Sequence, residues 1–167
     1  LGAAAAALAI GTPVDAVAAG LAAGRLSAFR MALGATAAGA RLLDDSYNAN
    51  PASMLAGLDA LAALVPAGTG RRVAVLGTMA ELGAGADAAH REVAAAAAER
   101  EIEVVAVAEP RYSIGGSSTG ASSTVVADVA EAVAHVVALD LGPADAVLVK
   151  ASRSAGLERV AAALRAP

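Results

Sequence analysis

The sequence predicts an α/β domain with an open, doubly wound and mostly parallel sheet, flanked by helices and preceded by short helices. Short valine-rich runs recur along the chain, and helical patterns separate them. The predicted strands begin near residues 42, 73 and 104, which is the spacing of successive strand–helix–strand units. Runs that stay apolar without alternation are typical of strands covered on both faces. These observations together favour a Rossmann-like arrangement.

The predicted strands are the apolar runs themselves. Glycine or a charged residue follows each run within two positions, which is typical of a strand that ends in a turn. The runs are 42–43, 73–76, 104–107, 124–126 and 146–149.

The segments between these runs predict helices. Residues 51–65 carry large apolar side chains at helical spacing, with Asn50 as the expected N-cap and Pro51 at the first helical position. The stripe consists of Met54, Leu58, Leu61 and Val65. Further helices are expected over 87–100, from Asp128 to about 139 with Glu131 completing the cap, and around 157–164.

The first 24 residues are apolar but do not predict a membrane span. Thr12 and Pro13 interrupt the run, and alanine contributes little transfer free energy. No basic residue precedes the stretch, so a signal peptide is not expected either. We expect two short helices with Thr12 capping the second, then an irregular segment from 24 to 30 and, after residues 31–34, a glycine-rich turn from 35 to 39. Residues 113–123 are expected to form a mobile surface loop.

Composition excludes several classes of protein. Alanine makes up 51 of the 167 residues, so the 57% hydrophobic content conceals a core fraction of ordinary size. The net charge of −4 and the scarcity of aromatic residues argue against nucleic-acid binding. There is no cysteine to form disulfides or bind metals, and two histidines far apart in sequence do not predict a metal site.

Three polar segments follow predicted strands and could carry chemistry, since ligands of such sheets bind at the carboxyl ends of the strands. They are 44–51 (DDSYNANP), 77–83 (GTMAELG) and 150–153 (KASR). The chain has neither a Gly-x-Gly-x-x-Gly motif nor a Gly-x-x-x-x-Gly-Lys-Ser/Thr motif, so it has no phosphate-binding loop of its own.

Each segment also has a purely structural interpretation. Asn50 could serve only as a helix cap. Asp44 and Asp45 could be solvated turn residues, or they could face a cation or a hydroxyl-rich ligand that relieves their repulsion. Lys150 and Arg153 are expected near the start of the last helix, where a cationic pair would form an anion site. We expect Glu81 and His90 to lie on the surface.

The polar segments together resemble the Mur ligases. The residues that carry the resemblance are DDSYNANPASM (44–54), VAVLGTMAELG (73–83), HREV (90–93) and VLVKASRSAGLERV (147–160), and their order and spacing agree with the family. The resemblance implies that residues 31–167 form the C-terminal domain. It implies that residues 1–30 are the closing helices of the central ATP-binding domain together with the hinge.

The resemblance also implies an activity. The full enzyme would use ATP and Mg²⁺ to phosphorylate the C-terminal carboxylate of a UDP-N-acetylmuramoyl tripeptide, and the amine of D-Ala-D-Ala would then attack the acyl phosphate. The C-terminal domain would close onto the central domain, in the cytoplasm, with no nucleic acid or membrane as partner. No complete catalytic set and no metal site lie in this chain, so it should be inactive alone.

Individual residues match the family's binding positions. Those matching nucleotide contacts are Arg30, Asp45, Tyr47, Asn48 and Asn50. Those matching the block that faces the dipeptide and the acyl phosphate are Lys150, Ser152 and Arg153.

Three positions depart from the family pattern. Phe29 and Ala151 replace glycines, and Thr78 replaces an aspartate. Thr78 puts a charged role at that position in doubt, and Ala151 could narrow the approach of a ligand to the backbone.

Two other functions stay open at this point. A phosphoacceptor receiver domain also has an acidic pair after its first strand and a lysine after its last, but it requires an aspartate where this chain reads Ala108-Glu109. A non-catalytic α/β binding module is the second alternative.

Overall fold

The computed structural model describes residues 2–24, 29–113 and 122–165. A six-stranded sheet has the order β1-β2-β6-β3-β4-β5. The edge strand β1 pairs antiparallel with β2, and every other pairing is parallel. The strands are β1 (Ala32–Ala35), β2 (Arg41–Asp45), β3 (Arg72–Leu76), β4 (Glu103–Val107), β5 (Ser123–Val126) and β6 (Ala146–Lys150). The predicted mixed, mostly parallel α/β fold is confirmed.

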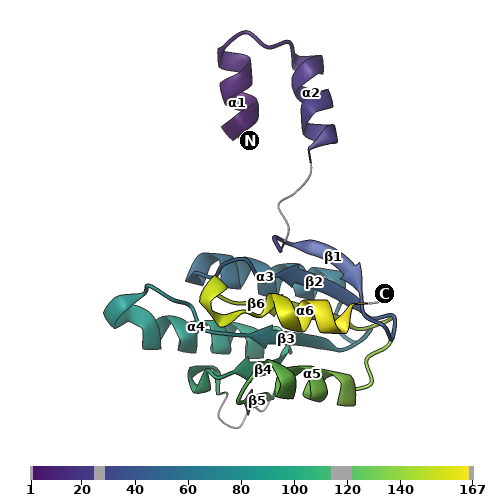
Figure 1. Ribbon diagram of the computed structural model, residues 1–167, viewed down its shortest axis with the longest axis vertical. Helices are drawn as coiled ribbons and strands as arrows, with labels where there is room; N and C mark the ends of the chain where they lie inside the picture. Colours follow the sequence, from purple (N-terminus) through teal and green to yellow (C-terminus); the bar gives the residue numbers. More distant parts are fainter. Residues whose placement is uncertain (1, 25–28, 114–121, 166–167) are drawn as a thin grey trace.

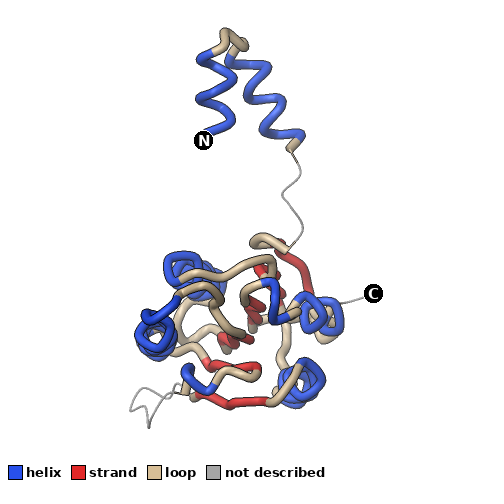
Figure 2. Tube along the Cα trace, turned by 60° about the vertical axis from the view of Figure 1, so that its left-hand side comes forward, coloured by secondary structure: helices blue, strands red, loops and turns tan. Residues whose placement is uncertain are grey.

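Helices cover both faces of the sheet (Figures 1 and 2). On one face α3 (Pro51–Leu64) and α4 (Ala86–Glu99) enclose a core that includes Ala74 and Leu76 of β3. On the other face α5 (Val129–Ala138) and α6 (Glu158–Leu164) pack over Val73 and Val75 of the same strand. Because successive side chains of a strand point to opposite faces, one valine-rich run supplies both cores.

The start of α3 follows the expected pattern. The Asn50 side chain accepts a hydrogen bond from the Ser53 N–H at 2.9 Å, and the Ser53 hydroxyl accepts one from the Asn50 N–H at 3.1 Å. This reciprocal pair satisfies two donors that a helix end would otherwise leave free. The predicted stripe of the helix is buried, so amphipathic spacing was a sound guide here. Asp128 caps α5 by accepting from the Glu131 N–H, but the Glu131 carboxylate accepts from the Ala127 N–H rather than from Asp128, so the pair is not reciprocal here.

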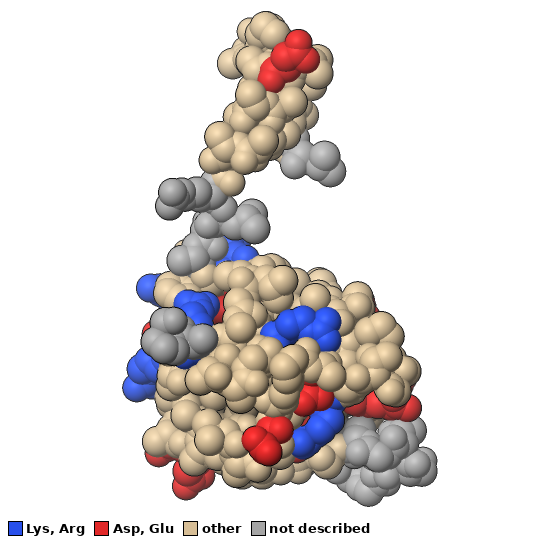
Figure 3. All heavy atoms as spheres, turned by 90° about the vertical axis from the view of Figure 1, so that its right-hand side faces the viewer, with Lys and Arg blue, Asp and Glu red and all other residues tan. Residues whose placement is uncertain are grey.

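The first two helices stand apart from the sheet in Figure 1. They are α1 (Gly2–Ala9) and α2 (Val14–Ala23), and neither has a buried residue. Their surface is almost entirely neutral (Figure 3), and it exposes the apolar side chains of Leu8, Ile10, Val14 and Leu21. The expectation that Thr12 caps α2 was wrong: Pro13 occupies the N-cap position, and no side chain caps the helix. In the described ranges, no helix is long and apolar enough to cross a membrane.

One strand was missed. Residues 32–35, for which the sequence predicted no strand, form β1 by pairing with β2 in the register Ala32↔Asp44 to Ala35↔Arg41. The segment ALGA has weak strand propensity of its own, so the neighbouring strand determines its conformation. The predicted loop 113–123 lies largely outside the described residues, and its last residue, Ser123, begins β5.

Candidate functional site

A pocket of about 520 Å³ lies at the carboxyl edge of the sheet. It is bordered by the segments that follow β2, β3 and β6, which the strand order β2-β6-β3 makes neighbours. All three polar segments singled out from the sequence therefore meet at one place, as the fold class predicts. The lining residues are Tyr47, Asn48, Ala49, Asn50, Ala80, Glu81, Leu82, Ser152, Arg153 and Ser154.

Lys150 lies beneath this pocket rather than in its lining. Its ammonium group is 2.5 Å from Asp45 Oδ2 and donates to the Asn48 carbonyl at 2.9 Å, and the residue is 1% exposed. The register of β2 and β6 places Asp45 directly beside Lys150. Gly57 of α3 leaves room for the lysine stem, since a Cβ there would lie 3.2 Å from Lys150 Cδ. Lys150 therefore holds the Asp45 carboxylate and the Asn48 backbone in place.

The two adjacent aspartates have different environments. Asp44 is fully buried and accepts hydrogen bonds from the Ser46 N–H, the Ser46 hydroxyl and the Arg165 guanidinium, so the solvated-turn interpretation was wrong for it. Asp45 is half-buried, and its Oδ1 accepts from the Met31 N–H at 3.0 Å while its Oδ2 meets Lys150. Asp45 thus joins the segment around residue 30 to the last strand.

Tyr47 brings together two arginines from distant parts of the sequence. The guanidinium carbon of Arg30 lies 4.2 Å from the centre of the Tyr47 ring, and that of Arg153 lies 5.4 Å from it. Both distances are within the range of cation–π attraction. The three side chains are exposed, so the cluster offers two cations and a ring edge to an anionic or aromatic ligand.

Asn48 and Asn50 make local hydrogen bonds. Asn48 Oδ1 accepts from the Ala49 N–H at 2.9 Å, and Asn50 caps α3. Both residues are exposed at the pocket, so the amide groups that these bonds leave free can reach a ligand.

Ser152 ties the three segments to one another. Its N–H donates to the Thr78 carbonyl, its hydroxyl oxygen accepts from the Ala80 N–H at 2.8 Å, and it also contacts the Ala49 carbonyl at 3.4 Å. Ala151, which replaces a glycine of the family pattern, is fully buried, and a Cβ at Gly77 would lie 2.9 Å from its own Cβ. The extra methyl group therefore enters the core beside Gly77 and does not narrow the pocket.

Lys150 and Arg153 were expected near the start of the last helix, but they do not lie there. The short 3₁₀ helix η3 (Arg153–Ala155) intervenes, and α6 begins only at Glu158. Of these two side chains, only Arg153 lines the pocket, and its guanidinium group lies against the Tyr47 ring.

His90 is completely buried, so the expectation of a surface role was wrong. Its Nε2 accepts from the Met79 N–H at 3.0 Å, and its Nδ1 is 2.6 Å from the Ala86 carbonyl. A carbonyl only accepts, so Nδ1 is the donor in this contact. A signal was available in the sequence: His90 shares the helical spacing of Val93, Ala94 and Ala97, all of them buried.

Glu109 and its neighbours complete a polar cluster behind the 77–82 loop. Glu109 Oε2 lies 3.5 Å from His90 Nε2, and Arg111 binds both carboxylate oxygens, at 2.6 and 2.5 Å. Tyr112 packs against the His90 ring and donates to the Gly77 carbonyl at 3.1 Å. Burial also raises the pKa of the Tyr112 hydroxyl, so it stays a donor. The cluster fixes both Gly77 and Met79.

Glu109 makes stability depend on pH. Burial raises the pKa of its carboxyl, but the hydrogen bonds from Arg111 and the positive charge of Arg111 outweigh burial, so the pKa lies below its usual value of 4.5. A pKa that is depressed in the folded state stabilises the protein at pH values above the pKa of the unfolded state, and this stabilisation is lost as the pH falls through the folded-state pKa.

We expect Glu109→Gln to lower the free energy of unfolding at pH 7 by about 1–3 kcal/mol. The difference should shrink below pH 4.5. Urea unfolding across this range, with Glu92→Gln as the exposed control, checks it; a difference independent of pH would contradict it.

The described residues supply no metal site, since no group of three His, Asp or Glu side chains comes together among them. The exposed cations near Tyr47 suit phosphate groups, whereas Asp45 is committed to Met31 and Lys150 in this structure.

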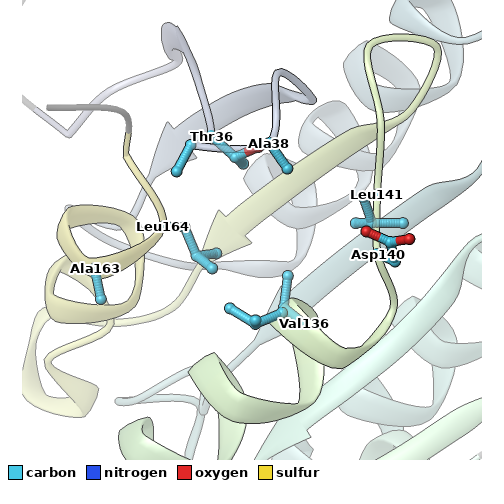
Figure 4. Close-up of a pocket in the computed structure, with 9 residues that line it drawn as sticks. Thr36, Ala38, Val136, Asp140, Leu141, Ala163 and Leu164 are labelled. Carbon is cyan, nitrogen blue, oxygen red and sulfur yellow. The ribbon is translucent and has the colours of Figure 1, made fainter.

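A second pocket, of about 210 Å³, lies on the α5–α6 side of the sheet (Figure 4). Its lining is mostly apolar, with Asp140 as its only charged residue. Thr36, Val136, Leu141 and Leu164 line it together with neighbouring residues. It offers no set of convergent polar groups, so the carboxyl edge is the better candidate site.

Known proteins resemble this chain over nearly its whole length. The family described as "Mur ligase, glutamate ligase domain" matches residues 29–153. A UDP-N-acetylmuramoyl-tripeptide--D-alanyl-D-alanine ligase of Mycobacterium tuberculosis is 42% identical over 183 residues, covering 97% of this chain and 36% of the relative. The Escherichia coli ligase of the same name is 38% identical over 175 residues, covering 99% and 36%. This chain thus spans about a third of the length of these relatives.

Solved structures agree with the sequence relatives. A crystal structure of MurF from Acinetobacter baumannii matches with a TM-score of 0.80 and 26% identity, covering 95% of this chain and 35% of that one. MurF from Thermotoga maritima in complex with ADP matches with a TM-score of 0.75 and 26% identity, covering 96% and 35%.

The family match includes all three segments that line the carboxyl-edge pocket. The comparisons favour the ligase interpretation over a receiver-like one, and the fold agrees with the MurF structures. This chain belongs to the Mur ligase family.

Proposed function

We propose that this chain is the C-terminal domain of a cytoplasmic ATP-dependent ligase that adds D-Ala-D-Ala to UDP-N-acetylmuramoyl tripeptide in peptidoglycan precursor synthesis. The observation that carries the proposal is the convergence of the three family segments on one pocket at the carboxyl edge. The ligases of this name in M. tuberculosis and E. coli support the choice of substrates.

The residues proposed to act on ligands form two groups. The group proposed to lie along the nucleotide is Arg30, Asp45, Tyr47, Asn48 and Asn50. The group proposed to face the dipeptide and the acyl phosphate is Lys150, Ser152 and Arg153. Lys150 would act through Asp45 and Asn48, because its ammonium group is buried against them. Ser152 would fix the positions of the three segments.

ATP would supply the phosphoryl group that activates the tripeptide carboxylate. This chain would contribute cations at Arg30 and Arg153, which can neutralise phosphate and a peptide carboxylate, and a pocket in which the attacking amine is held near the acyl phosphate. The Mg²⁺ ligands and the phosphate-binding loop would belong to a central domain. Residues 1–30 are proposed to be the closing helices of that domain together with the hinge. The rest of the central domain would cover the apolar faces of these helices.

An assay of the full-length protein that contains this chain tests the proposal. ADP release should require ATP, Mg²⁺, UDP-N-acetylmuramoyl tripeptide and D-Ala-D-Ala together, and mass spectrometry should detect the pentapeptide product. ADP release that does not depend on D-Ala-D-Ala but increases when a single amino acid is added would contradict the choice of substrate. Labelling of an aspartate by acetyl phosphate would instead favour the receiver-like alternative.

Arg30 gives a sharper prediction within the same assay. Arg30→Ala should raise the KM for ATP by about 10- to 100-fold, because a charged contact to phosphate is lost. The KM for D-Ala-D-Ala should change little. Arg91→Ala is the matched control, since Arg91 is an exposed arginine on α4 outside the pocket lining. An unchanged KM for ATP in Arg30→Ala would remove Arg30 from the nucleotide site.

A further inference from the structure

Two opposite charges line the carboxyl-edge pocket without neutralising each other. Glu81 and Arg153 both contribute to its wall, and both are exposed. Within the described ranges, neither side chain forms a hydrogen bond or an ion pair, and the Arg153 guanidinium only stacks on Tyr47. A pocket with one free anion and one free cation is complementary to a ligand that carries both charges.

Glu81 is held in an unusual backbone conformation. Its φ is 66°, in the left-handed region that non-glycine residues seldom occupy. A residue keeps such a conformation only where its surroundings determine it, and residues of this kind concentrate at ligand sites. A glycine would adopt this backbone without strain. A glutamate here places a carboxylate at the pocket.

The four residues before Glu81 are each anchored to another element. Gly77 donates to the Lys150 carbonyl at 3.1 Å and accepts from the Tyr112 hydroxyl. The Thr78 carbonyl accepts from the Ser152 N–H, the Met79 N–H donates to His90, and the Ala80 N–H donates to the Ser152 hydroxyl oxygen. These contacts fix the loop, so Glu81 occupies a defined position at the rim of the carboxyl-edge pocket.

Resting on the function proposed above, we infer that this pocket binds D-Ala-D-Ala as a zwitterion. The Glu81 carboxylate receives the ammonium group of the dipeptide, and the Arg153 guanidinium receives its C-terminal carboxylate. Small side chains at Ala49 and Ala80, together with Leu82, give the two methyl groups an apolar wall. Glu81 is thus a substrate-binding residue that the family resemblance did not assign.

The two charges also predict which dipeptide derivatives would bind weakly. A dipeptide amide lacks the negative charge that Arg153 requires, and an N-acylated dipeptide lacks the positive charge that Glu81 requires. Either loss leaves one protein charge without its partner in the bound state, which weakens binding.

Steady-state kinetics of the full-length protein test the role of Glu81. Glu81→Gln keeps the length of the side chain and removes its charge, so the KM for D-Ala-D-Ala should rise about 10- to 100-fold, with the KM for ATP within about twofold. Glu101→Gln is the matched control, because Glu101 is also an exposed glutamate with positive φ (54°), located at the turn before β4 and outside this pocket. An unchanged KM for the dipeptide in Glu81→Gln would overturn the inference.

Glu81→Gly separates the carboxylate from the stability of the loop. It relieves the left-handed backbone, so the protein should unfold no more easily, while the KM for D-Ala-D-Ala rises as in Glu81→Gln. A wild-type KM in Glu81→Gly would show that the carboxylate does not bind the substrate.

The dipeptide amide tests Arg153. The wild-type protein should use D-Ala-D-Ala at least about tenfold better than its amide, and Arg153→Gln should lose this preference. The same preference in Arg153→Gln would overturn the assignment of Arg153. A wild-type protein that forms no product from D-Ala-D-Ala would overturn the proposed function itself, whereas an active wild type with unaffected Glu81 and Arg153 variants overturns only this inference.

Discussion

Lys150→Met is expected to lower the free energy of unfolding by about 3–5 kcal/mol, because it leaves a partly buried carboxylate without its partner. The lost contacts are the 2.5 Å ion pair with Asp45 and the hydrogen bond to the Asn48 carbonyl. Methionine fills most of the volume of the lysine stem, so the loss is electrostatic rather than a cavity. Urea unfolding of the purified protein measures the change.

An exposed ion pair provides the control. Arg71 and Glu103 lie 3.0 Å apart with side chains 47% and 22% exposed, so Arg71→Met should cost at most about 1 kcal/mol. The double variant Asp45→Asn/Lys150→Met should recover part of the loss, since it removes the unpaired charge. Equal costs for Lys150→Met and Arg71→Met would show that Lys150 does not hold Asp45.

His90→Leu is expected to destabilise the protein by about 2–3 kcal/mol, because it leaves the buried Met79 N–H without an acceptor. Leucine is similar in size to the ring, so packing against Tyr112 should largely survive. The loop that carries Glu81 would lose one of its anchors. We therefore also expect a higher KM for D-Ala-D-Ala in the full-length protein.

His135→Leu is the matched control for this variant. The His135 side chain is 29% exposed on α5, and its distance to Glu103 is 4.0 Å. Its replacement should change the free energy of unfolding by no more than about 0.5 kcal/mol. A His90→Leu variant as stable as His135→Leu would mean that another group satisfies Met79.

The lysine shows the limit of sequence reasoning at the site. Its position at the end of the last predicted strand placed Lys150 at the carboxyl edge of the sheet, and this placement was correct. The same position suggested an exposed cation near a helix start, whereas the side chain is buried against Asp45. These two residues are 105 positions apart, and only the pairing of β2 with β6 brings them together.

The sequence by itself determined the elements whose signals are local. The valine-rich runs became strands, Asn50 and Asp128 became caps, and the apolar stripe of α3 was buried, because spacing and capping act within a few residues. The polar segments after the strands likewise identified the carboxyl edge.

Only the tertiary structure decided what each polar residue does there. It created β1 by pairing it with β2, buried His90 against the Met79 N–H and Asp44 against Arg165, and placed Arg30 and Arg153 beside Tyr47. It also fixed Glu81 in a left-handed conformation on the pocket rim. The physical reason is that burial and charge pairing depend on which segments become neighbours, and strand order rather than local propensity sets those neighbours.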